Sequence, residues 1–112
     1  MNYSIIQTNP DGGERLQYTV PDFPVRAVHG DLSSFRDYAA NCHWHPDFEL
    51  LLADEGSIDY FVNGQIVHLR QGQAIFVNAN RLHYGFSEKK QECLYTCVVF
   101  HPAVFGVQEQ SP

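Results

Sequence analysis

The sequence predicts an all-β domain built from two antiparallel sheets, either a sandwich or a barrel. Clusters of turn-forming residues recur at short intervals along the chain and leave little room for helices. Between them lie about eight short runs rich in β-branched and aromatic residues, which we expect to be strands: 16–20, 25–28, 48–53, 57–62, 65–69, 74–77, 83–86 and 94–100. Short strands at this spacing are typical of sandwiches and barrels.

Two segments allow a more detailed prediction. Between the runs 57–62 and 65–69, Asn63 and Gly64 supply the two positive-φ positions of a type I′ turn, so these runs are expected to form a hairpin with a fixed register. The stretch from Leu32 to Ala40 is the one that could form a helix, although its end could equally lead into a strand.

The predicted order of segments along the chain is an arm, a domain and a short end piece. A chain of 112 residues is long enough for one domain with a substantial core. Residues 1–15 are polar and rich in turn formers, which predicts an N-terminal arm. Residues 16–105 carry the predicted domain, and residues 106–112 are expected to be the start of a linker or the end of a fragment.

Composition and charge exclude several classes of protein. Hydrophobic residues make up 44% of the chain and charged residues 18%, which excludes a predominantly disordered chain. The formal net charge of −6 would repel a phosphate backbone, so this domain alone is not expected to bind nucleic acid. No apolar run has the length of a membrane helix and no secretory signal is evident, which predicts a cytoplasmic protein without membrane contact. Cys42, Cys93 and Cys97 lack CxxC spacing and are expected to be small, buried, reduced residues.

The pattern HxHxxxE at His43, His45 and Glu49 indicates a candidate metal site. Side chains two residues apart share one face of a strand, so the two imidazoles and the carboxylate are expected to point the same way. His83, which follows the turn after the 74–77 run, is the candidate fourth ligand. The set suits one divalent transition metal, Zn, Ni, Fe or Mn, without choosing among them. The alternative is a buried hydrogen-bonded network that holds no ion.

These histidine-containing segments resemble the two motifs of the cupin family. The first motif corresponds to HxHxxxExxxxxxG at 43–56 and the second to Gx5NxNxxH at 72–83, with the hairpin between them. The sequence departs from the family pattern where Asp37 replaces Gly, Asn78 replaces Pro, Asn80 replaces Gly and Ser87 replaces Asn. The departures weigh against an enzyme.

The details are most similar to the N-terminal cupin domains of AraC-type transcription regulators. The matching segments are His-Trp-His-Pro-Asp-Phe-Glu-Leu at 43–50, Leu-Ala-Asp-Glu-Gly-Ser at 52–57, the stretch 72–83, Asp-Phe-Pro-Val at 22–25 and Phe-His-Pro at 100–102. The resemblance implies a double-stranded β-helix, the jelly-roll barrel of two antiparallel sheets. It also implies a homodimer that binds a small molecule in the barrel, a sugar or related metabolite, and so controls a C-terminal helix-turn-helix half absent from this chain.

The residues predicted to contact such an effector are His43, His45, Glu49, Tyr60, His83, Tyr84 and Arg81. Without an ion, the imidazoles and the carboxylate could still accept hydrogen bonds from sugar hydroxyls. For Tyr60 the alternative is an ordinary core position, and for Arg81 a solvated loop position, although Arg81 could bind an anionic effector.

A rival prediction is a stand-alone metal-dependent cupin enzyme, an isomerase or dioxygenase. It would use His43, His45, Glu49 and His83 as metal ligands and leave coordination positions open for substrate. No further catalytic acid or base is evident in the sequence, so no catalytic residue is assigned.

Overall fold

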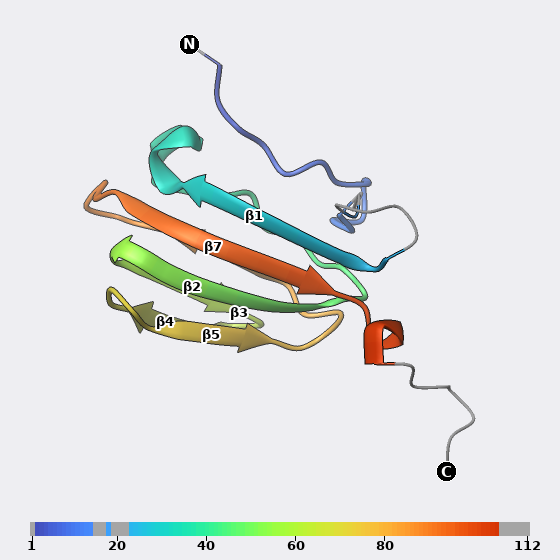
Figure 1. The fold of residues 1–112 in the computed structure, drawn as a ribbon. Coiled ribbons are helices and arrows are strands. Elements are labelled where there is room, and N and C mark those ends of the chain that lie inside the picture. The colour runs from blue at the N-terminus through green and yellow to red at the C-terminus, as the bar shows by residue number, and fades with distance from the viewer. Residues whose placement is uncertain (1, 15–17, 19–22, 106–112) are drawn as a thin grey trace.

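Two antiparallel sheets packed face to face form the domain, as the sequence predicts. The computed structural model describes residues 2–14, 18 and 23–105. Figure 1 shows the larger sheet in front and strands of the smaller sheet behind it. The larger sheet has the strand order β1-β7-β2-β5, with bounds Val25–Asp31, Cys93–Phe100, Phe48–Gly56 and Ala74–Val77. The smaller sheet has the order β4-β3-β6, with bounds Gln65–Leu69, Ile58–Val62 and His83–Phe86.

Every described run that was predicted to be extended is a strand. The predicted strand at 16–20 falls on positions of which only residue 18 lies within the described residues. The stretch 32–40 forms two 3₁₀ turns, η1 (Leu32–Ser34) and η2 (Arg36–Tyr38), and no longer helix. A positive φ of 56° at Asp37 breaks the helical path there. A third such turn, η3 (Pro102–Phe105), follows β7.

The hairpin between β3 and β4 confirms the predicted turn. Asn63 and Gly64 have φ values of 48° and 93°, the two positive values that a type I′ turn requires. The register pairs Val62 with Gln65 and Ile58 with Leu69, so Tyr60 faces the barrel interior from the middle of β3.

The core lies between the two sheets and follows the strand alternation. In β2 the inward side chains are Glu49, Leu51 and Ala53, each at most 3% exposed, whereas Leu50 between them is 42% exposed. Ile58 and Tyr60 of β3 face them from the smaller sheet. Because Glu49 belongs to this inward set, the alternation places a carboxylate inside the barrel.

The cysteine prediction holds in part. All three thiols are free; Cys93 is buried and Cys97 half-buried. Cys42 is exposed, so the prediction of a buried residue is wrong for it. The inward position next to it belongs to His43, and alternation turns Cys42 outward. No helix among the described residues is long and apolar enough to cross a membrane.

Candidate functional site

The structure brings His43, His45, Glu49 and His83 together inside the barrel. All four side chains are buried, and their candidate ligand atoms lie within 4.8 Å of one another. His43 and His45 precede β2, Glu49 lies in β2, and His83 begins β6. His43 and His83 exchange backbone hydrogen bonds, with N–O distances of 3.2 and 2.9 Å, which ties the two motifs across the sheets.

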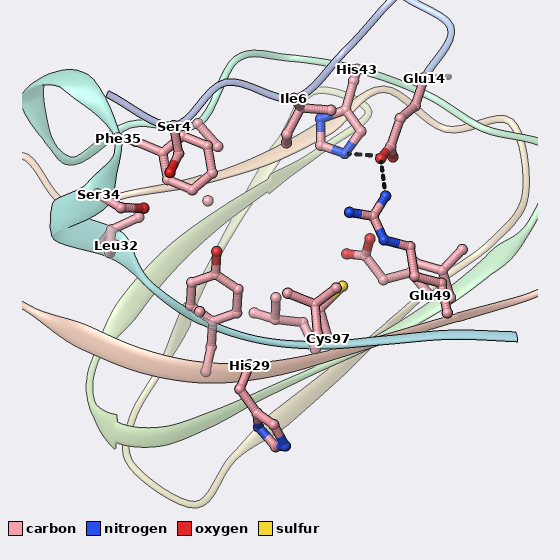
Figure 2. A pocket seen from close by; sticks show the side chains of 18 of the residues that line it. Ser4, Ile6, Glu14, His29, Leu32, Ser34, Phe35, His43, Glu49 and Cys97 are labelled. Atoms are coloured by element: carbon pink, nitrogen blue, oxygen red, sulfur yellow. Dashed lines mark hydrogen bonds and ion pairs between the residues drawn. The ribbon is translucent and has the colours of Figure 1, made fainter. Parts of the chain in front are cut away.

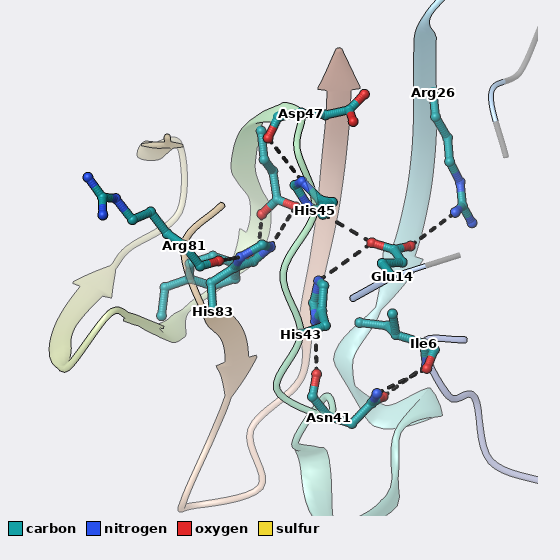
Figure 3. A network of polar contacts seen from close by, with 11 residues as sticks. Ile6, Glu14, Arg26, Asn41, His43, His45, Asp47, Arg81 and His83 are labelled. Atoms are coloured by element: carbon teal, nitrogen blue, oxygen red, sulfur yellow. Dashed lines mark hydrogen bonds and ion pairs between the residues drawn. The ribbon is translucent and has the colours of Figure 1, made fainter. Parts of the chain in front are cut away.

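Backbone carbonyls fix the orientation of each imidazole ring (Figure 3). Nδ1 lies 2.9 Å from the Asn41 carbonyl in His43, 3.0 Å from the Asp47 carbonyl in His45, and 2.7 Å from the Arg81 carbonyl in His83. A carbonyl oxygen only accepts hydrogen bonds, so Nδ1 carries the proton in each ring. The Nε2 atoms of the neutral rings therefore present lone pairs.

Two of these Nε2 atoms face a single carboxylate oxygen. Oε1 of Glu49 lies 3.4 Å from Nε2 of His45 and 3.2 Å from Nε2 of His83, and the Tyr60 hydroxyl donates to the other oxygen. If both rings are neutral, the Nε2 lone pairs of His45 and His83 face the Glu49 carboxylate oxygen. Such a buried contact between hydrogen-bond acceptors costs free energy unless a proton or a cation lies between them. Imidazole nitrogens and a carboxylate oxygen are the donor set of Zn, Fe, Mn and Ni sites, so the residues fit such an ion.

The surroundings shift the pKa values of three groups in the cluster in different directions. Burial alone would raise the pKa of Glu49, but hydrogen bonds with His45 and His83 hold it well below its usual range. Burial lowers the pKa of His43 to about 4. Burial would also lower the pKa of His45, yet the contact with Glu49 outweighs it and raises that pKa. At neutral pH the cluster therefore holds an ionised carboxylate and a neutral His43.

Glu14 of the N-terminal segment joins this site from outside the motifs. Its Oε1 atom lies 3.8 Å from Nε2 of His43 and 4.0 Å from Nε2 of His45, and Arg26 of β1 donates to Oε2 at 3.3 Å. Burial raises the pKa of Glu14. Sequence reasoning missed this residue because it lies in the predicted arm and no local pattern marks it.

A cavity of about 870 Å³ lies beside the cluster. Figure 2 shows Glu14, His43 and Glu49 at one side of it, with Ile6 of the N-terminal segment along its edge. The rest of the lining comes mainly from β1, from the 3₁₀ turn η1 with Phe35, and from interior side chains of β2, β3 and β7. The space is within the size range of small-molecule sites.

The predicted effector-binding residues divide into two groups. His43, Glu49 and Tyr60 line the cavity, and His45 and His83 adjoin it through the cluster. Tyr84 lies on the opposite face of β6 from His83 and packs against Phe61 and Phe86. The Arg81 side chain is exposed, and only its carbonyl reaches the cluster. Strand alternation thus separates Tyr84 from the cavity, and the turn keeps the Arg81 guanidinium outside it.

Comparison with known proteins identifies similar sequences and folds. The family model described as AraC-like ligand binding domain matches residues 27–108. An uncharacterised HTH-type transcriptional regulator of Bacillus subtilis (strain 168), YdeC, is 25% identical over 96 residues, which are 86% of this chain and 33% of that protein. The chain therefore spans about one third of the length of this relative.

Solved structures of cupins share the fold. An RmlC-like cupin from Shewanella frigidimarina superposes with a TM-score of 0.61 at 19% identity, covering 76% of this chain and 73% of that one. A cupin 2 conserved barrel domain protein from Salinispora arenicola superposes with a TM-score of 0.63 at 12% identity, covering 82% and 76%. The predicted cupin double-stranded β-helix is confirmed.

Proposed function

This chain belongs to the family of AraC-like ligand-binding domains, and we propose that it binds a small effector in the barrel cavity and thereby controls the DNA-binding part of a cytoplasmic regulator. The observation that carries the proposal is the cavity of about 870 Å³, which the histidine and glutamate cluster and the N-terminal segment border together. An effector bound there would touch both the barrel interior and the N-terminal segment.

A sugar or related metabolite is the first class of effector to test. Nε2 of His43 and the Glu14 carboxylate lie 3.8 Å apart and both accept hydrogen bonds when His43 is neutral and Glu14 is ionised. Hydroxyl groups of a ligand could donate to both acceptors. A thermal-shift screen of sugars and related metabolites tests this proposal, because a ligand that binds only the folded state raises the melting temperature.

The N-terminal segment is the proposed moving part. Its attachment to the barrel includes two hydrogen bonds with the Asn41 side chain, from Ile6 N at 2.9 Å and to Ile6 O at 3.0 Å, and one from Ser4 N to Ser34 O at 2.8 Å. Figure 1 shows the segment, in blue, passing along η1 and β1. An effector that prefers the attached state shifts the equilibrium toward it, whereas one with equal affinity for both states shifts nothing.

Replacing Asn41 with alanine is expected to loosen the segment. The substitution removes both hydrogen bonds to Ile6 and leaves the Asn41 carbonyl that orients His43. Loss of about 1–2 kcal/mol of local stability corresponds to roughly 5–30-fold faster amide exchange over residues 4–8. Hydrogen-exchange mass spectrometry measures this. Asn78→Ala, at an exposed loop position, is the matched control, and equal exchange in the two variants contradicts the attachment.

Homodimerisation is proposed through the outer face of the larger sheet. Phe48, Phe76 and Phe100 lie close together there, with ring centroids of Phe48 5.4 and 5.8 Å from the other two, and Leu50 pairs with Phe76 across the strands. Leu50 and Phe76 are 42% and 51% exposed. A contiguous apolar face of this kind favours burial against a second copy.

The dimer proposal predicts that Phe76→Glu produces a monomer, because a carboxylate would be buried in the interface. Light scattering coupled to size exclusion measures the mass. Ile66→Glu is the control, since Ile66 is also exposed, at 63% against 51% for Phe76, but lies on β4 of the other sheet. The assignment fails if the wild-type chain is already monomeric or if both variants remain dimeric.

A second candidate function is a metal-dependent cupin enzyme, an isomerase or dioxygenase. The cluster of His43, His45, Glu49 and His83 favours it, because the ligand atoms are close enough to share one ion. A bound divalent ion would act as a Lewis acid toward an oxygen of the substrate or of the effector. Turnover of a hydroxylated substrate by the metal-loaded chain would favour the enzyme, whereas binding without turnover favours the sensor.

A further inference from the structure

The N-terminal segment forms a tight turn just before Glu14. Asn9 N donates to Gly13 O at 2.7 Å, and Gly12 N donates to Asn9 O at 2.9 Å. The Asp11 side chain closes the turn, because its Oδ1 atom accepts a hydrogen bond from Gly13 N at 2.8 Å. The turn is therefore held by its own hydrogen bonds, and Glu14 follows it in a fixed direction.

Trp44 attaches this turn to the barrel. Its backbone N donates to Gly12 O at 3.0 Å, and its carbonyl accepts a hydrogen bond from Glu14 N at 2.7 Å. The indole Nε1 donates to Asp11 O at 3.2 Å, and the ring lies so close to the turn that a Cβ at Gly13 would be 3.0 Å from it. The backbone of Glu14 is thus paired with the residue that separates the two histidines of the first motif.

The Glu14 carboxylate lies against the candidate metal ligands (Figure 3). Its Oε1 atom is 3.8 Å from Nε2 of His43 and 4.0 Å from Nε2 of His45. Zinc binds imidazole nitrogen and carboxylate oxygen at about 2.0–2.2 Å, so two such donor atoms on one ion lie at most about 4.3 Å apart. Both distances satisfy this limit, as do the 3.4 and 3.2 Å from Glu49 Oε1 to Nε2 of His45 and His83. Glu14 is therefore close enough to both histidines to share one ion with them.

The second carboxylate oxygen of Glu14 is held by Arg26 of β1. Arg26 Nη1 donates to Oε2 at 3.3 Å, while Oε1 is directed toward the two histidines. Carboxylates that bind a metal are commonly hydrogen-bonded by an outer group in this way. The Glu14 side chain is 11% exposed, so it is directed into the barrel although it comes from the N-terminal segment. An ion pair with Arg26 alone would not require Oε1 to face two imidazole nitrogens.

We propose that Glu14 is a metal ligand supplied by the N-terminal segment, so that binding of one ion at the cluster also fastens the segment to the barrel. The inference rests on the candidate metal site and on the proposed function, in which this segment is the moving part. Coupling between two binding events is reciprocal, so attachment of the segment strengthens metal binding by the factor by which the ion strengthens attachment. The ion and a hydroxylated effector would be alternative partners of Glu14 and His43, so the sugar screen is to be run on the metal-free chain.

The zinc affinity of Glu14→Gln tests the assignment of the ligand. Glutamine keeps the size of the side chain and can still accept the hydrogen bond from Arg26, but its neutral amide is a weak ligand for Zn²⁺. Zn²⁺ is titrated into the purified chain in competition with a chromophoric chelator. The variant is expected to bind Zn²⁺ about 10-fold or more weakly than the wild type.

Asp11→Asn is the matched control for this titration. It makes the same carboxylate-to-amide change in the same segment, at an exposed position, and it keeps an acceptor for the hydrogen bond from Gly13 N. We expect it to bind Zn²⁺ like the wild type.

Amide exchange of the N-terminal segment tests the coupling. Each chain is measured by hydrogen-exchange mass spectrometry over residues 4–14, with and without saturating Zn²⁺. In the wild type, Zn²⁺ is expected to slow the exchange by a factor similar to the loss of affinity in Glu14→Gln. In Glu14→Gln, Zn²⁺ should leave the exchange of the segment unchanged. Any loosening caused by a weaker contact with Arg26 is present in both measurements of the variant and cancels.

The contrary results separate the levels of the proposal. Equal Zn²⁺ affinity of Glu14→Gln and the wild type, or an equal loss of affinity in Asp11→Asn, overturns Glu14 as a ligand and leaves the cluster of four residues as the metal site. Weaker binding by Glu14→Gln without slower exchange in the zinc-loaded wild type overturns the coupling. Absence of Zn²⁺ binding by the folded wild type contradicts both the ligand and the metal site, whereas effector binding in the cavity is judged separately by the sugar screen.

Discussion

Replacing His45 with alanine is expected to reduce the metal content of the purified chain from about one divalent transition-metal ion to almost none. His45 is fully buried, and its Nε2 atom lies 3.4 Å from Glu49 Oε1 with the lone pair directed into the cluster. Loss of a side chain that only orients a metal ligand costs roughly 10–100-fold in affinity, so loss of the ligand His45 itself should cost more. Elemental analysis after reconstitution with Zn²⁺, Mn²⁺, Fe²⁺ or Ni²⁺ measures the stoichiometry.

His68→Ala is the matched control for this experiment. His68 is exposed on β4 and pairs with Asp59 at 2.7 Å, away from the cluster. We expect His68→Ala to bind metal like the wild type. A wild-type chain that folds normally and takes up no metal, or a His45→Ala variant that retains it, contradicts the metal assignment and supports a hydrogen-bonded network held by protons.

Replacing Gly56 with alanine is expected to destabilise the fold by about 4 kcal/mol, at the upper end of single substitutions. Gly56 ends β2 with a φ of 79°, where L side chains are strained. A Cβ there would also collide with the backbone carbonyl oxygen of Glu92, just before the paired Cys93 of β7. The backbone at Glu92 cannot move away without disturbing the pairing of β2 with β7, the two central strands of the larger sheet.

Gly64→Ala separates the collision from the backbone strain. Gly64 has a φ of 93°, and a methyl group at this position would have no neighbour within 4 Å, so only the conformational cost remains, about 1–2 kcal/mol. Urea denaturation of both variants gives the comparison. Equal losses of stability in the two variants would show that the close contact with Glu92 adds nothing to the destabilisation caused by Gly56→Ala.

Much of the site follows from the sequence because strand alternation is a local rule. His43, His45, Asp47 and Glu49 are all buried, so the alternation continues past Pro46. The same rule explains why Tyr84, which was predicted to contact the effector, does not face the cavity. It follows His83 directly in the chain, so its side chain lies on the other face of β6.

The parts that escaped prediction depend on contacts between distant segments. Glu14 reaches the cluster only because the N-terminal segment pairs with the residues before β2, with Glu14 N donating to Trp44 O at 2.7 Å. Asn41 likewise belongs to no sequence motif. Its side chain holds the N-terminal segment through two hydrogen bonds to the backbone of Ile6. The hairpin at Asn63-Gly64 was predictable from the turn alone, whereas the pairing of β1 with β7 joins opposite ends of the chain and leaves no local signal.

Effector binding in the barrel is tested most directly by a thermal-shift titration of the purified chain with sugars and related metabolites, repeated on His43→Ala. His43 lines the cavity and belongs to the cluster. At a free ligand concentration about ten times Kd, we expect a saturable rise in melting temperature of about 5–10 °C, which is lost in His43→Ala. An unchanged melting temperature across the panel, or an equal rise in the variant, would contradict effector binding in the barrel.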